Sequence, residues 1–270
     1  ILMNMSSPSR PANRELPAVD ERLVAPESGY EIDDGKLVRV PPCEEPHGDR
    51  HSKLAALLEA HVANDFNVAL DMLTRISETS DRAPDASVYP RARDPQTGGR
   101  QIEQLAFEIV STESLGYAAK KAADLSGRGV RRVFAIDVER ARAFEWSREL
   151  GTWSLLDPSG RIEDSTLAVP LSIEVLVRAV KTDDAMARAL LAKGNSVLLA
   201  AIDESRVAAT AQATAHATAQ AILRVLERRN VQLAASDRAR ILRAQDLAVL
   251  ERWLDRAATC VQATELFSED

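Results

Sequence analysis

The segment EQLAFEIVS, residues 103–111, decides the fold expected for this chain. It is a short β-prone run next to polar and glycine-containing stretches, which predicts a β-strand. Residues 114–126, which carry several Ala and Leu residues, follow as a predicted helix that Gly127 and Gly129 bring to an end. Residues 132–138 then return to a β-prone pattern. This strand, helix and strand in close succession predict an α/β domain with helices packed on a sheet.

The residues before this segment extend the same pattern. Two strand-like runs, 30–33 and 36–40, flank Asp34-Gly35, a pair that tolerates the positive φ angles of a tight hairpin. Apolar residues at helical spacing then predict a helix over residues 51–66. The remaining expected strands cover residues 68–75, 85–89, 142–146 and 152–156. The fold class expected for residues 19–180 is therefore α/β, with a mixed α+β sheet.

The composition is that of an ordinary water-soluble protein. The chain has 270 residues, of which 45% are hydrophobic and 28% are charged. No run of 18 or more apolar residues is present, and the first residues lack the continuous apolar region of a signal peptide. We therefore expect a cytoplasmic protein without a membrane partner.

The charge and the cysteine count restrict the classes of function. The net charge of -7 argues against a general nucleic-acid coating protein, because such proteins use clustered Lys and Arg, but it does not exclude a nuclease. Cys43 and Cys260 are too far apart in sequence for a zinc motif or a disulfide framework. Two arginine groups are either solvated surface charge or DNA contacts: Arg91, Arg93 and Arg100, and Arg128, Arg131 and Arg132.

The composition changes sharply after Lys181. Helices are expected over residues 182–193 and 196–229, and two shorter helices are expected to begin at Ser236 and Asp246. The near-repeat ATAQ-ATAH-ATAQ, residues 209–220, alternates like a strand, but Ala favours a helix.

The expected organisation is thus a flexible tail over residues 1–18, an α/β domain over 19–180 and an all-α C-terminal module over 181–270. Ala-rich helices approach one another closely but anchor weakly on a single domain. We therefore expect residues 182–267 to form a homodimer or a higher symmetric homo-oligomer.

Two carboxylates stand where the predicted strands would bring them together. Glu108 lies inside an apolar strand, where a charge is costly unless it is paired or binds a cation. Asp85 follows Pro84 at the start of a neighbouring predicted strand. Two such oxygen ligands suit Mg²⁺ or Mn²⁺, so we expect Asp85 and Glu108 to bind one divalent ion.

A lysine on the following helix completes this constellation. When the apolar residues of the helix face the sheet, Lys121 lies at the edge of the buried stripe and Lys120 lies on the solvent side. Lys121 is therefore expected to reach the sheet, where its ammonium group could hold the attacking water and stabilise charge on a phosphate. His51 and His61 are interpreted as structural helix-face histidines.

Residues 21–177 resemble the Uma-type family of restriction endonucleases, a branch of the PD-(D/E)XK nuclease superfamily. The resemblance rests on the order and spacing of short segments. These are YEIDDG (30–35), His51, Pro84-Asp85, FEIVS (107–111), Lys121, and Gly129-Val130 leading to FAID (134–137).

The resemblance implies a restriction-endonuclease-like core and a magnesium-dependent phosphodiesterase. It implies that Asp85 and Glu108 are the metal ligands and that Lys121 is the catalytic lysine. The superfamily places this lysine two residues after the acidic ligand, where this chain has Val110, so Lys121 would act from the next helix.

The function expected is that of a metal-dependent DNA endonuclease. Two alternatives remain open at this stage. One is a catalytically silent nuclease-fold protein that binds nucleic acid or a partner. The other is an oligomeric scaffold that works through its C-terminal helices.

Overall fold

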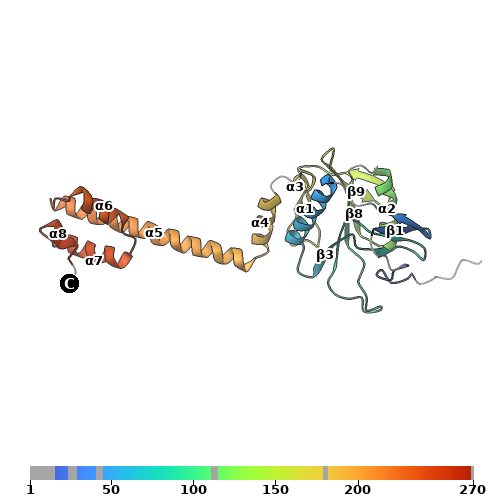
Figure 1. Ribbon diagram of the computed structural model, residues 1–270, viewed down its shortest axis with the longest axis horizontal. Helices are drawn as coiled ribbons and strands as arrows, with labels where there is room; N and C mark the ends of the chain where they lie inside the picture. The colour runs from blue at the N-terminus through green and yellow to red at the C-terminus, as the bar shows by residue number, and fades with distance from the viewer. Residues whose placement is uncertain (1–15, 24–28, 41–44, 111–114, 179–181, 269–270) are drawn as a thin grey trace, which may run out of the picture. The chain divides into compact units, whose positions relative to one another are not determined.

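A computed structural model describes residues 16–23, 29–40, 45–110, 115–178 and 182–268 (Figure 1). Contacts divide the chain into two units, residues 1–193 and residues 194–270. All but the last three residues of the tail expected over residues 1–18 lie outside the described residues.

A six-stranded sheet forms the centre of the first unit. Its strand order is β10 (Thr152–Leu155), β9 (Arg142–Ser147), β8 (Arg132–Asp137), β7 (Leu105–Val110), β6 (Ala86–Pro90) and β3 (Phe66–Leu70). Strands β7 and β8 are parallel, with Glu108 opposite Ala135, and the other neighbours are antiparallel. The mixed α/β sheet expected from the sequence is confirmed.

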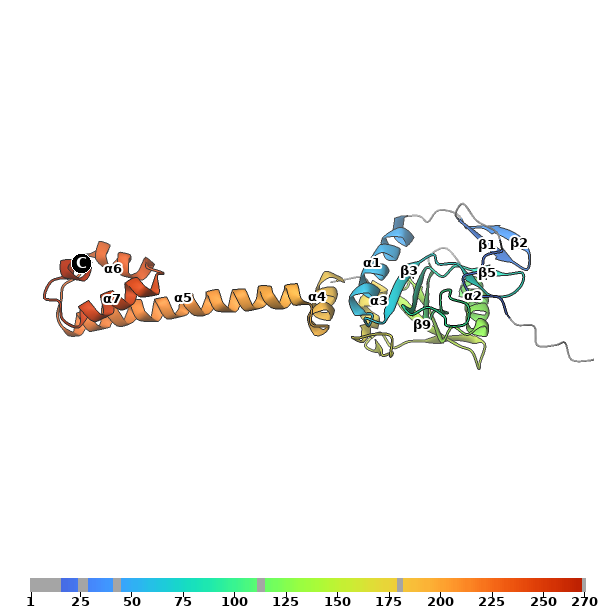
Figure 2. The same cartoon turned by 90° about the horizontal axis from the view of Figure 1, so that it is seen from below.

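Two helices cover opposite faces of this sheet. Helix α1 (Glu45–His61) packs its leucines on the face that carries Phe107 and Ile109. Helix α2 (Leu115–Arg128) connects the parallel strands β7 and β8 and covers the other face, where Ala106 is buried. Figure 2 shows α1 and α2 apart from each other in this unit. Because side chains alternate along β7, Glu108 shares the face of Ala106 and points toward α2.

Helix α1 begins and ends earlier than the helix expected over residues 51–66. Gly48 has a low helix propensity, so the residues before His51 were not expected to be helical. Pro46 lies in the first turn, where its missing N–H is not needed by the helix. The earlier start places His47 on the helix, one turn before His51.

A second sheet lies next to α2 and has the order β2 (Lys36–Arg39), β1 (Tyr30–Asp33), β5 (Asp81–Arg82) and β4 (Thr74–Arg75). The expected hairpin between β1 and β2 is confirmed, and its turn residues Asp34 and Gly35 have φ values of 47° and 78°. Strands β11 (Arg161–Ile162) and β12 (Leu171–Ser172) form a separate pair. Helix α3 (Ile173–Arg178) follows directly.

Helix α4 (Thr182–Ala192) belongs to the first unit by its contacts. It packs against α1, and Lys193 just after it donates a hydrogen bond to the Glu59 carbonyl at 3.3 Å. The contacts therefore divide the chain after Lys193, one helix later than the composition change at Lys181.

The second unit consists of α5 (Ser196–Arg228), α6 (Ala235–Arg243), α7 (Leu247–Ala257) and α8 (Ala263–Leu266). The Ala-Thr repeat lies within α5, so the helix prediction is confirmed and the strand alternative is wrong. The core of this unit contains the C-terminal part of α5 together with residues of the three shorter helices: Ala215, Ala219, Ile222, Leu226, Ile241, Leu250, Trp253 and Leu266.

Among the described helices, no single one is long and apolar enough to span a membrane, and α4 and α5 meet that criterion only when taken together.

Candidate active site

Asp85 lies directly before β6 and is held by the neighbouring strand. Its Oδ2 accepts a hydrogen bond from the backbone N–H of Ile109 in β7. Burial by itself raises the pKa of Asp85, but His47, His51, Lys121 and the Ile109 N–H together hold that pKa well below its usual range. Asp85 is therefore an ionised carboxylate with one oxygen fixed by the backbone.

Glu108 is buried in β7, with 3% of the residue exposed. Its Oε2 lies 2.8 Å from Lys121 Nζ, whereas Oε1 has no hydrogen-bond partner among the described residues. Burial raises the pKa of Glu108 to about 8; Asp85 and Glu31 act in the same direction and Lys121 opposes them. A buried carboxylate whose second oxygen has no hydrogen-bond partner would be stabilised by a further cation.

Lys121 reaches this region from α2. Its Nζ donates to the carbonyl of Ala83 at 3.1 Å and lies 3.3 Å from Glu31 Oε1. Burial lowers the pKa of Lys121, but the carboxylates of Glu108, Glu31 and Asp85 raise it above its ordinary value, so the side chain is an ammonium ion. Lys120 is 52% exposed and pairs with Asp33, so the orientation expected for the two lysines is confirmed.

Glu31 is a third carboxylate at this position that the sequence analysis did not assign to the site. It comes from β1 and is 2% exposed. Its Oε1 accepts a hydrogen bond from the Ala83 N–H at 3.0 Å, and Oε2 is without a hydrogen-bond partner in the described parts of the chain. Lys121 thus lies between two buried carboxylates. The only signal in the sequence was the position of Glu31 within the family-like segment YEIDDG.

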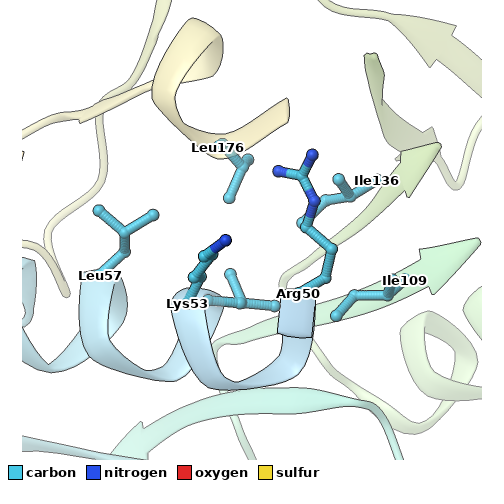
Figure 3. A pocket seen from close by; sticks show the side chains of 7 residues that line it. Arg50, Lys53, Leu57, Ile109, Ile136 and Leu176 are labelled. Carbon is cyan, nitrogen blue, oxygen red and sulfur yellow. The ribbon is translucent and has the colours of Figure 1, made fainter. Parts of the chain in front are cut away.

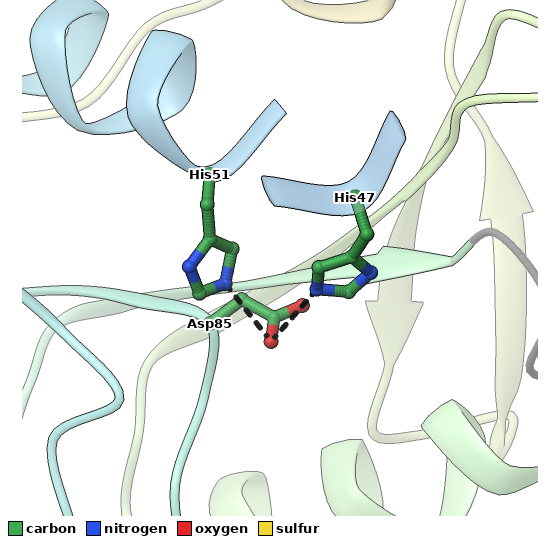
Figure 4. Close-up of side chains that lie close together, drawn as sticks. All are labelled: His47, His51 and Asp85. Carbon is green, nitrogen blue, oxygen red and sulfur yellow. Dashed lines mark ion pairs between the residues drawn. The ribbon is translucent and has the colours of Figure 1, made fainter. Parts of the chain in front are cut away.

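Two histidines of α1 approach Asp85 from its other side (Figure 4). His47 Nε2 lies 3.7 Å and His51 Nε2 lies 3.2 Å from the same atom, Asp85 Oδ1. Asp85 raises the pKa of His51 while burial lowers it, and the net shift is upward. His51 therefore has a carboxylate partner that was not expected from the sequence. His47 was not expected at this position either, although a spacing of four residues places both rings on one helix face.

His61, at the end of the same helix, differs from these two. It is 4% exposed, and its Nδ1 lies 2.7 Å from the Leu57 carbonyl within the helix. Burial lowers the pKa of His61. Its contacts are those of a helix-face histidine in the protein interior, as the sequence analysis interpreted it.

Among the described residues, His47, His51 and Asp85 form a group that could hold a metal ion, because their ligand atoms lie within 4.8 Å of one another. Glu108 is not in this group of three. Of the two carboxylates expected to bind a cation, Asp85 therefore has a set of nearby nitrogen ligands, whereas Glu108 contacts Lys121.

A small pocket lies between α1, the sheet and α3 (Figure 3). Arg50 and Lys53 of α1 reach its rim, and Ile109, Ile136 and Leu176 form apolar walls. Arg50 Nη1 is buried and finds no hydrogen-bond partner in the described ranges. Arg50 and Lys53 thus place positive charge at this pocket.

Of the six arginines considered as DNA contacts, five have side chains that form hydrogen bonds to other described residues. Arg100 pairs with buried Glu103 at 2.9 Å, and Arg132 pairs with Glu145 at 2.7 Å. The other three are Arg128 with the Arg75 and Pro17 carbonyls, Arg131 with Asp164, and Arg91 with Asn67. These contacts favour structural roles for most of the two groups.

Comparison with known proteins gives a family and one structural likeness. The Uma2 family, described as "Putative restriction endonuclease", matches residues 15–179, which is more than half of the chain. A solved structure of a putative nuclease belonging to DUF820, from Anabaena variabilis ATCC 29413, is similar with 18% identity and a TM-score of 0.46. The match covers 55% of this chain and 89% of that one. Among curated proteins, none matches this chain.

The family match agrees with the segments on which the resemblance in the sequence rested, all of which lie within the matched range. In the structure these segments lie on or next to the six-stranded sheet, on α1 and α2, and on the hairpin of the second sheet. This chain therefore belongs to the Uma2 family of putative restriction endonucleases.

Proposed function

We propose that this protein is a divalent-cation-dependent endonuclease that hydrolyses phosphodiester bonds in DNA. The observation that supports this proposal most is the contact of Lys121 with Glu108 at 2.8 Å, beside a backbone-anchored Asp85. Two carboxylates and an ammonium ion are the groups that cation-assisted phosphodiester hydrolysis uses. Membership of the Uma2 family supports the same class of reaction.

In this proposal Asp85 and Glu108 hold the divalent ion, and Mg²⁺ and Mn²⁺ are the expected ions. The fit rests on the open Glu108 Oε1, which is buried with no hydrogen-bond partner in the described structure, and on the ionised Asp85. The bound ion supplies Lewis-acid polarisation of the phosphate. Such an ion would give Glu108 a further cationic partner, which would offset the cost of its burial.

Lys121 acts as a cation in this scheme. Because its pKa is raised, its ammonium donates hydrogen bonds and stabilises the negative charge that develops on the phosphate oxygens. Glu31 and the Ala83 carbonyl hold the Nζ in place, and thereby restrict the directions in which it can donate. Glu31 is accordingly proposed as a positioning residue.

The experiment that tests the proposal compares two glutamates of the same sheet. The full chain is incubated with supercoiled plasmid and, separately, with a structured RNA, in Mg²⁺ or Mn²⁺. We expect plasmid cleavage that Glu108→Gln abolishes. Glu145→Gln is the matched control because Glu145 pairs with Arg132 on the neighbouring strands and should retain cleavage.

Three other outcomes would contradict the proposal. Cleavage of RNA alone would show that the substrate is RNA and not DNA. Binding of plasmid without cleavage in either ion would favour a catalytically silent nuclease fold. Equal cleavage by wild type and Glu108→Gln would remove Glu108 from the reaction.

A further inference from the structure

We infer that His47, His51 and Asp85 form a cation site that selects a first-row transition ion such as Mn²⁺ over Mg²⁺. This inference rests on the proposed function, which gives the ion its role in the reaction. It adds the class of ion that this region binds. It is carried by the three side chains and their contacts.

The three candidate ligand atoms lie within 4.8 Å of one another. His47 and His51 stand four residues apart on α1, and their ring centroids are 5.1 Å apart. Both Nε2 atoms approach Asp85 Oδ1, while Oδ2 of the same carboxylate is occupied by the Ile109 N–H. Figure 4 shows the two rings converging on this carboxylate. One oxygen of Asp85 is thus oriented by the sheet, and the other faces the imidazoles.

The contact between His51 and Asp85 is a close contact between an imidazole and a carboxylate. His51 Nε2 lies 3.2 Å from Asp85 Oδ1, yet this buried nitrogen has no aligned hydrogen-bond partner among the residues described. Hydrogen bonding weakens steeply when donor and acceptor are misaligned. The two atoms are close enough to each other to serve as two ligands of one ion.

The donor set decides the class of ion. Mg²⁺ dehydrates reluctantly and is usually bound through carboxylates and retained water. Imidazole nitrogen suits Zn²⁺, Cu²⁺, Fe²⁺ and Ni²⁺, and affinities for a given site rise along the first row from Mn²⁺, the weakest binder, toward Cu²⁺. Two imidazoles with one carboxylate therefore favour a transition ion.

A fourth side chain lies close to this group. Asp71 Oδ1 is 3.9 Å from His51 Nε2, and its side chain is 69% exposed. It therefore adds negative charge at the solvent side of the site. A cation would enter from this side, where Asp71 attracts it.

Calorimetric titration of the full chain tests the inference in the absence of nucleic acid. We expect Mn²⁺ to bind at least about tenfold more tightly than Mg²⁺ to the wild-type protein. His51→Ala and His47→Ala should each weaken Mn²⁺ at least about tenfold and change Mg²⁺ less than about threefold. His216→Ala is the matched control, because His216 is an exposed helix residue of the second unit and should change neither affinity.

A spectroscopic measurement keeps the test decisive if an alanine variant fails to fold. Electron spin echo spectra of the Mn²⁺-loaded wild type should show modulation from directly bound nitrogen, and His51→Gln should reduce it. Circular dichroism establishes which variants are folded. The absence of nitrogen modulation in the wild type, or equal Mn²⁺ affinity in the wild type and folded His47 and His51 variants, overturns the inference.

The two proposals can fail separately. Nitrogen-bound Mn²⁺ without cleavage of any plasmid would leave this site standing and contradict the nuclease. Plasmid cleavage supported equally by Mg²⁺ and Mn²⁺, with no effect of the histidine variants on Mn²⁺ affinity, would leave the nuclease standing and contradict this site.

Discussion

Lys121 Nζ lies 2.8 Å from Glu108 Oε2, although Lys121 belongs to helix α2 and Glu108 to strand β7. Val110 occupies the strand position two residues after Glu108, where the superfamily places its lysine. The ammonium group beside Glu108 therefore comes from helix α2 and not from strand β7. The side chain spans from α2 to β7 and remains buried over its length, with 10% of it exposed.

The first prediction concerns the two adjacent lysines. Lys121→Ala should lower the rate of plasmid cleavage by about 100-fold or more, because it removes the donor that stabilises charge on the phosphate. Lys120→Ala should retain most of the activity, since Lys120 is exposed and pairs with Asp33. Initial rates of both variants, with circular dichroism as the check of folding, measure this difference. A reversed order of the two variants would contradict the role of Lys121.

Glu31 should act through Lys121 and not through the substrate. We predict that Glu31→Gln lowers kcat about tenfold with little change in KM, because the ammonium loses a charged partner that orients it. Asp33→Asn serves as the control, since Asp33 lies on the same strand and contacts Lys120 and Arg82. Steady-state kinetics of both variants separate the two constants. A change confined to KM, or an equal loss in both variants, would argue against positioning by Glu31.

Asp164 is predicted to stabilise the first unit. It pairs with Arg131 at 2.6 Å and with Arg132 at 3.1 Å. Burial raises the pKa of Asp164, but hydrogen bonds from Arg131, Thr166 and Arg132 hold that pKa well below its usual range. Asp164→Asn should lower the free energy of unfolding by about 2 kcal/mol at neutral pH.

The pH dependence of this effect has a definite sign. A depressed pKa contributes stability that is fully present above the unfolded-state pKa of about 3.9 and is lost as the pH falls toward the folded-state pKa. The difference between wild type and Asp164→Asn should therefore shrink below about pH 4. Urea unfolding followed by tryptophan fluorescence measures it, with the exposed Glu163→Gln as control. If the difference in unfolding free energy between wild type and Asp164→Asn grew at low pH, the prediction would be contradicted.

The C-terminal helices are predicted to make the protein a homodimer or a higher symmetric oligomer through residues 182–267. The N-terminal part of α5 exposes apolar side chains, with Val197 at 74% and Val207 at 60% exposure. Because α4 packs against α1, the informative truncation ends at Lys193. Light scattering should give an oligomer for the full chain and a monomer for the truncated chain. A monomeric full chain, or an oligomer unaffected by truncation, would refute the prediction.

The order of elements was largely predictable from the sequence, because each prediction depends on local periodicity. The hairpin at Asp34-Gly35, strand β7 and helix α2 all follow from signals within a few residues. The start of α1 did not, since Gly48 weakens the local helix pattern. Tertiary packing extended α1 toward the N-terminus and brought His47 to Asp85.

The surroundings of the site were less predictable than its expected centre. Asp85, Glu108 and Lys121 stand out through strand position, apolar neighbours and helix phase. Glu31 and His47 lie more than thirty residues before Asp85 in the sequence, and spacing along the chain does not indicate which residues meet in space. Only the fold reveals that two carboxylates share Lys121, and that two histidines share Asp85.

The most direct test of the central claim is cleavage of supercoiled plasmid by the purified full chain, with Asp85→Asn beside the wild type. Asp85 is required both by the carboxylate pair and by the histidine group, so its loss should remove activity with either Mg²⁺ or Mn²⁺. We predict nicked or linear plasmid for the wild type in Mn²⁺, none after addition of EDTA, and none for Asp85→Asn. Intact plasmid in every cation, or the same products from wild type and Asp85→Asn, would contradict the account.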